Sequence, residues 1–76
     1  MNNQDHEMAK ETILATLKYE TLNLTDHEVD LLIQDLYELI ISIGGDFTKQ
    51  NIRYYLLEYI KNDFYPRFRA IHKNEL

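Results

Sequence analysis

Residues 25–44 constrain the fold most, because they contain the start, the apolar stripe and the end of one helix. Thr25 stands three residues before Glu28, which is the spacing of a capping box. Gly44 is the expected residue just beyond the helix. Between them, apolar side chains recur every three or four residues in a stripe about 120° wide. They are Val29, Leu32, Ile33, Leu36, Leu39, Ile40 and Ile43. The pattern predicts a helix over 26–43.

A second helix is predicted over 48–64 from a similar start. Thr48 is the expected N-cap, although Asn51 replaces the Glu or Gln of a complete capping box. The residue before a proline avoids the helical conformation, so this helix should end before Pro66. Proline suits the first position of a helix, which predicts a short further helix over 66–73.

The segment 4–21 reads as a helix with two apolar sides. One side carries Ile13, Leu14 and Leu17. The other carries Met8, Ala15, Tyr19 and Leu22. A helix of this kind lies between two neighbours or shows one side to a partner. Leu31 and Ile41 also fall outside the main stripe of the helix 26–43. We therefore expect more apolar side chains than one small bundle can bury.

The length of 76 residues predicts one domain, 1–76, with a thin core, since chains this short bury only about 60% of the surface that the unfolded chain exposes. The expected fold is all-α: a small three-helix bundle with a short fourth C-terminal helix, in which the second and third helices form an antiparallel hairpin. The expected core comprises Val29, Leu32, Ile33, Leu36, Ile40, Ile43, Phe47, Ile52, Tyr55, Leu56, Tyr59 and Ile60.

No apolar run approaches the roughly 18 residues of a membrane span, and the first residues do not form a secretory signal. We therefore expect a cytoplasmic protein without a membrane partner. The chain has no cysteine, which excludes disulfides and thiolate metal sites. Its abundant Asn, Ile, Lys and Tyr are typical of AT-rich genomes and favour a bacterial or phage origin.

Acidic and basic residues are unevenly distributed along the chain. Residues 1–48 carry a net charge of −8, residues 49–74 carry +4, and the whole chain carries −5. Such an uneven distribution influences which partners each surface attracts, but it does not determine the fold. An acidic surface of this kind suggests one hypothesis, a nucleic-acid mimic that inhibits a basic target. A solubilising role is the more common reason for surplus carboxylates.

No catalytic pattern is present. His27 and Glu28 resemble the start of a metal-binding HExxH motif, but the second histidine is missing. Gly44 and Gly45 lack the spacing and the preceding strand of a nucleotide-binding loop. We predict a protein that is not an enzyme and that uses no cofactor, metal or small-molecule substrate.

Two helices joined by a glycine-containing turn also match the outline of a helix-turn-helix. In that alternative, the start of the helix 48–64 would read DNA, and its residue types suit guanine and adenine edges. The candidate DNA-binding residues are Lys49, Gln50, Asn51 and Arg53. Against this alternative, the preceding helix is strongly acidic and would repel phosphates over a Debye length of about 8 Å.

The favoured hypothesis is a small regulatory or adaptor protein that binds another protein, with a homodimer as one form of this. Aromatic residues and arginine are enriched at binding hot spots, and the segment after residue 63 is rich in both. The candidate protein-binding residues are Met8, Tyr19, Leu22, Leu31, Ile41, Tyr54, Tyr65, Arg67, Phe68 and Arg69.

The two hypotheses predict different responses to salt and mutation. A DNA-binding protein should lose affinity for duplex DNA steeply as salt is added, and Lys49→Ala or Arg53→Ala should weaken it further. A protein adaptor should not shift DNA at all in a gel and should respond to changes at Leu31, Tyr54 or Phe68. Gel-shift titrations of the purified chain at two salt concentrations distinguish these outcomes.

Overall fold

The computed structural model describes residues 2–62 and contains three helices, α1 (Asn3–Tyr19), α2 (Asp26–Ser42) and α3 (Lys49–Lys61). The all-helical architecture is confirmed for this part of the chain. The start of α2 at Asp26 is as predicted, and the other helix ends differ from the predicted ranges by one to three residues. The predicted fourth helix, 66–73, lies outside the described residues.

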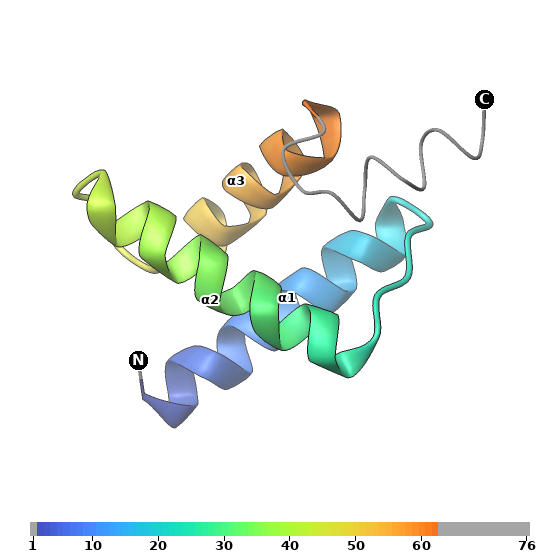
Figure 1. The fold of residues 1–76 in the computed structure, drawn as a ribbon, viewed down its shortest axis with the longest axis horizontal. Coiled ribbons are helices and arrows are strands. Elements are labelled where there is room, and N and C mark those ends of the chain that lie inside the picture. Colours follow the sequence, from blue (N-terminus) through green and yellow to red (C-terminus); the bar gives the residue numbers. More distant parts are fainter. Residues whose placement is uncertain (1, 63–76) are drawn as a thin grey trace.

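Each helix packs against the other two (Figure 1). The chain runs along α1, turns back along α2, and then returns along α3 (Figure 1). Lys49 at the start of α3 lies beside the middle of α1, whereas Leu57 lies beside the end of α1. The chain therefore runs in the same direction in α1 and α3. Among residues 2–62, no helix is both long enough and apolar enough to cross a lipid bilayer.

The side-chain caps at the helix starts follow the sequence closely. The capping box of α2 is confirmed: Thr25 Oγ1 accepts from the Glu28 N–H at 3.2 Å, and Glu28 Oε1 accepts from the Thr25 N–H at 3.0 Å. Thr48 Oγ1 caps α3 by accepting from the Asn51 N–H. Asn2, which the sequence reading did not identify as a cap, accepts from the Asp5 N–H at the start of α1.

The same backbone motif ends α1 and α2. At the end of α2, the Gly45 N–H donates to the Ile40 carbonyl and the Gly44 N–H to the Ile41 carbonyl, and Gly44 has a φ of +81°. This is a Schellman motif with glycine in the left-handed position. At the end of α1, that position is held by Thr21, with a φ of +58°. A β-branched residue is strained there.

The Schellman motif of α1 also corrects the prediction that Leu22 is exposed. The Leu22 N–H donates to the Leu17 carbonyl at 2.8 Å, which turns the chain back over the helix. The residue in this position commonly packs against the last turn of its helix. Leu22 is accordingly buried in the core together with Leu17.

The core is formed by apolar residues from all three helices and by Leu22. Its members are Ala9, Ile13, Leu17, Leu22, Val29, Leu32, Ile33, Leu36, Ile40, Ile52, Leu56 and Ile60. Phe47, Tyr55 and Tyr59 are partly buried against it, and Phe47 packs edge-to-face on Tyr37 with ring centroids 5.1 Å apart. The prediction that Ile43 belongs to the core is wrong. Ile43 is the C-cap of α2 and is 54% exposed, because the chain leaves the helix there.

The two Schellman motifs form a matched pair for a stability test. Thr21→Gly should raise the free energy of unfolding by about 0.5–1 kcal/mol, because glycine adopts the left-handed conformation without strain. Gly44→Ala should lower it by about 1 kcal/mol. A Cβ at position 44 has no atom within 4 Å, so the cost there comes from the backbone alone. In thermal melts, opposite shifts of the two midpoints are expected, and a lower midpoint for Thr21→Gly would contradict the assigned strain.

Candidate protein-binding groove

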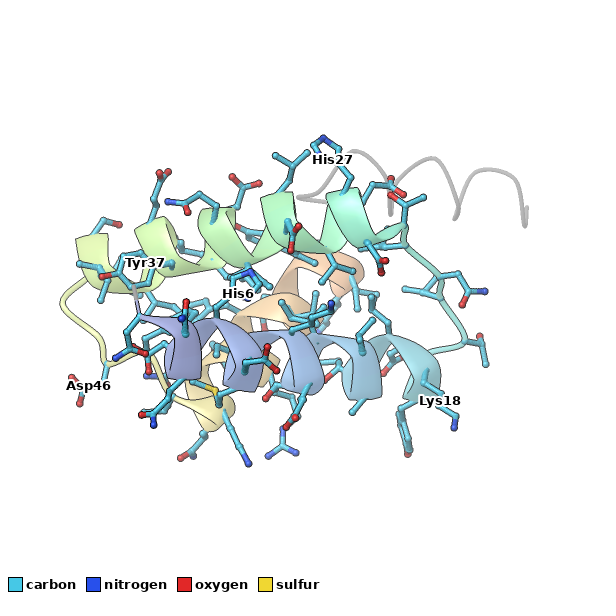
Figure 2. All side chains as sticks on the ribbon, turned by 90° about the horizontal axis from the view of Figure 1, so that it is seen from below. His6, Lys18, His27, Tyr37 and Asp46 are labelled. Atoms are coloured by element: carbon cyan, nitrogen blue, oxygen red, sulfur yellow. The ribbon has the colours of Figure 1, made fainter. Side chains whose placement is uncertain are left out.

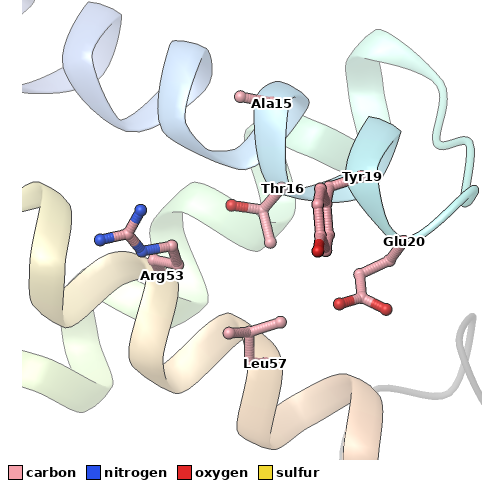
Figure 3. Close-up of a pocket in the computed structure, with 6 residues that line it drawn as sticks. All are labelled: Ala15, Thr16, Tyr19, Glu20, Arg53 and Leu57. Atoms are coloured by element: carbon pink, nitrogen blue, oxygen red, sulfur yellow. The ribbon is translucent and has the colours of Figure 1, made fainter.

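A groove runs between α1 and α3 on the surface of the bundle (Figure 3). One stretch has a volume of about 330 Å³ and lies between Tyr19 and Glu20 on α1 and Leu57 on α3. A second stretch of about 260 Å³ lies between Glu11 on α1 and Lys49 on α3. Both stretches share Ala15, Thr16 and Arg53. They therefore form one continuous surface feature, which we call the α1–α3 groove.

Small side chains on α1 create this groove. Thr12, Ala15 and Thr16 face α3, and they are too short to fill the space between the two helices. The Thr12 hydroxyl donates to the Met8 carbonyl at 2.8 Å, and the Thr16 hydroxyl donates to the Thr12 carbonyl at 2.8 Å. Because both hydroxyl donors are satisfied within α1, the floor of the groove can meet an apolar group.

Tyr19 is the most exposed large apolar side chain in the described part of the protein, at 87%. Its ring reaches from α1 toward the side of the groove formed by Leu57, which is 37% exposed (Figure 3). A large aromatic ring costs little conformational entropy to immobilise and contributes a large contact area. Tyr19 therefore has the chemistry of a binding anchor.

The two walls of the groove carry opposite charges. Glu11 and Glu20 line it from α1, and Lys49 and Arg53 line it from α3. Within residues 2–62, none of these four side chains has an oppositely charged group within 4 Å. The charges of the groove are therefore available to groups outside this part of the chain.

A second groove, of about 330 Å³, lies between the end of α2 and α3. Its lining residues are Leu39, Tyr54, Tyr55, Glu58 and Tyr59. Tyr54 is 56% exposed, and its ring meets that of Tyr55 edge-to-face at 4.9 Å. Tyrosine side chains therefore form most of the lining of this second groove.

Asp35 on α2 and Tyr59 on α3, beside the second groove, both have a pKa above its ordinary value. Partial desolvation, with a smaller contribution from the charge of Glu38, raises the pKa of Asp35 above its ordinary value. Burial, followed by the charge of Asp35, raises the pKa of Tyr59. Asp35 is thus a carboxylate whose ionisation is opposed by its surroundings.

The structure disperses the residues that the sequence nominated for protein binding. Tyr19 lies in the α1–α3 groove, and Tyr54 lies in the second groove. Leu31 and Ile41 are about half exposed on α2 and line neither groove. Met8 is partly buried against the core, and Leu22 is buried within it. Tyr65, Arg67, Phe68 and Arg69 lie outside the described residues.

The residues nominated for DNA binding do not share one free surface. Lys49 and Arg53 line the α1–α3 groove, opposite Glu11. The Asn51 amide donates to the Asp46 carbonyl at 2.7 Å, so it holds the loop before α3. Gln50 is exposed.

Sequence reasoning missed Leu57 and the small residues of α1 as parts of a site. Leu57 had no assigned role because it lies outside the core stripe of α3. The small residues Thr12, Ala15 and Thr16, at helical positions i, i+3 and i+4, were the available signal. Side chains of that size on one helical face indicate either a close helix approach or an unfilled gap.

The histidines do not form a metal site in the described part of the chain. His6 on α1 faces α2, where its Nε2 lies 3.4 Å from Asp30 Oδ1, and His27 projects from the start of α2 (Figure 2). Within residues 2–62, no three His, Asp or Glu side chains gather into a group able to hold a metal ion.

Comparisons with known proteins add no family assignment. No family model, no curated protein and no solved structure matches this chain. The functional proposal is therefore argued from the geometry and charge of the α1–α3 groove.

The raised pKa of Asp35 predicts a pH-dependent effect on stability. Above that pKa, the folded chain holds a carboxylate that is less well solvated than in the unfolded chain, so ionisation of Asp35 lowers stability at neutral pH. Asp35→Asn should therefore stabilise the protein at pH 7, by at most about 0.5 kcal/mol for this surface position. The gain should vanish once the pH falls below the ordinary aspartate pKa. Denaturant titrations at both pH values test this, and an equal gain at both would contradict it.

Proposed function

We propose that this chain is a small non-catalytic regulatory or adaptor protein that binds another protein through the α1–α3 groove. The observation that carries the proposal is a continuous groove with an apolar floor, an exposed aromatic ring at one end and, on both walls, charged side chains that have no opposite charge within 4 Å among residues 2–62. Buried anchors surrounded by a polar rim are the usual anatomy of a protein interface.

Three properties of the groove support a protein ligand. Tyr19 and Leu57 offer apolar area at the surface, where a monomer gains nothing from exposing them. Arg53 lies between the two stretches and can bind a carboxylate through two parallel hydrogen bonds. The groove also extends from Glu11 to Glu20 on one side and from Lys49 to Leu57 on the other, which suits an extended or helical segment of a partner.

The alternative of DNA binding has less support. A recognition helix needs its first residues free to enter the major groove. In this chain Lys49 and Arg53 lie beside Glu11, and the Asn51 amide is engaged by Asp46. The alternative of an acidic nucleic-acid mimic rests on α2, which carries five carboxylates and no lysine or arginine. It stays a prediction from charge alone.

The proposal predicts that removing the anchors weakens capture of the partner. The full chain, immobilised and exposed to an extract of its native host, should retain a partner protein. The amount retained should depend on the side chains of the groove. Tyr19→Ser and Leu57→Ser should each lower the affinity for that partner by about 10-fold or more, as expected for interface anchors. Quantitative mass spectrometry of the retained proteins over a dilution series measures this change.

Matched controls are available on α2. Leu31 and Ile41 are exposed to a similar degree as Leu57 but lie outside the groove, so Leu31→Ser and Ile41→Ser remove comparable apolar area elsewhere. These variants should leave capture unchanged, an expectation that replaces the sequence-based one for Leu31 because Leu31 does not line the groove. A partner lost equally from the groove and control variants, or retained by all four, would refute the groove as the binding surface.

A further inference from the structure

We propose that the occupant of the α1–α3 groove is a second copy of this chain, bound as a two-fold symmetric pair in which α1 of each copy lies on α3 of the other. The inference rests on the proposed function, because it takes the groove to be a protein-binding surface. It adds the identity of the occupant and the register in which it binds.

The charges of the groove restrict which partner can cover it. A partner that covers both walls must place cations against Glu11 and Glu20 and carboxylates against Lys49 and Arg53. A partner with one sign of charge would leave one wall buried and unpaired, which is unfavourable because those charges lose their hydration without gaining an opposite charge. The required pattern is one acidic wall beside one basic wall, and the groove itself has this pattern.

Two-fold symmetry allows this pattern to complement itself. A half-turn about an axis that runs parallel to the groove and in front of it brings the acidic wall of one copy against the basic wall of the other. Glu11 and Lys49 line the same stretch of the groove. After the rotation, Glu11 therefore meets the partner's Lys49 at the same level. By the same symmetry, the partner's Glu11 meets Lys49 of the first copy, as an isologous interface requires.

The apolar residues fall into a matching register. Tyr19 and Leu57 line the same stretch, and Arg53 lies one turn before Leu57 on α3. The same rotation places the Tyr19 ring against the partner's Leu57 and Arg53. That contact removes the most exposed ring of the described chain from water and sets a guanidinium near an aromatic face.

Two other exposed surfaces of the described chain do not share this property. The solvent side of α2 belongs to a helix with five carboxylates and no lysine or arginine, so two copies of it would repel each other. The second groove, beside Tyr54, has Glu58 as its only charged lining residue among those described. Of these three surfaces, the α1–α3 groove is the one whose lining carries both signs of charge.

Charge reversal is a cleaner test than added salt. The net charge of −5 repels two copies at long range, while the groove pairs attract them at short range, and salt weakens both effects.

Sedimentation equilibrium of the full chain, from about 1 μM to about 1 mM, should show a reversible shift from 9.2 kDa toward twice that mass. E11K and K49E should each weaken the association by about 10-fold or more, because each creates two like-charge contacts per dimer. The double variant E11K/K49E should restore it to within about 3-fold of the wild type.

Controls make each outcome decisive. Glu11 and Lys49 are exposed, so these variants should keep the helical circular dichroism of the wild type. Glu38→Lys, on α2 outside the groove, should not weaken the association. A chain that stays monomeric throughout, or a dimer indifferent to E11K and K49E, would overturn the proposal. If the chain is monomeric but Tyr19→Ser still abolishes capture of another protein, the second-copy inference fails and the proposed function stands. If neither association nor capture responds to Tyr19→Ser, both fail.

The register itself can be trapped, since the chain has no cysteine of its own. A mixture of the single variants E11C and K49C, oxidised gently, should yield mainly the cross-link that joins one copy of each. E11C or K49C alone, and mixtures in which E38C replaces either, should cross-link about 10-fold less, as expected when thiols do not face each other. Equal yields from all mixtures would overturn the proposed register.

Discussion

The packing of α1 against both α2 and α3 is the constraint on which the rest of the structure depends. Ala9 and Ile13 are fully buried where α1 meets its neighbours, and α1 contributes to the single core that all three helices share. Ala15 and Thr16 on the side of α1 that faces α3 are too short to fill the space between the two helices. The α1–α3 groove therefore stays open beside the packed core.

Charge then gives the open groove its chemical identity. Glu11 and Glu20 stand on α1 and Lys49 and Arg53 on α3, so the groove divides positive from negative along its length. In an isolated chain these groups are solvated and contribute little to stability. When a complementary surface excludes water, the same groups enforce register and reject partners with the wrong pattern. A thin core and a patterned groove thus favour function through association.

The sequence predicted the helices well because their signals are local. The capping box at Thr25 and the apolar stripe of α2 depend on residues within a few turns, as does the exposure of Tyr54. The errors arose where the chain direction changes. Leu22 is buried by a Schellman turn at a threonine, a residue that seldom adopts the left-handed conformation, and Ile43 leaves the core at the helix end. The groove could not be predicted, because it depends on which face of α1 packs against α3. The periodicity of apolar residues shows which faces of a helix are apolar, but it does not show which helix each face contacts.

The solvent reactivity of Tyr19 tests the central claim, that the α1–α3 groove is covered by a second chain, most directly. Hydroxyl-radical footprinting of the full protein can follow oxidation of Tyr19 as protein concentration rises, with exposed Tyr54 as the internal reference. The account predicts full reactivity of Tyr19 in dilute solution and progressive protection at higher concentration, with Tyr54 largely unchanged. Tyr19 reactivity that stays the same at every concentration would contradict it.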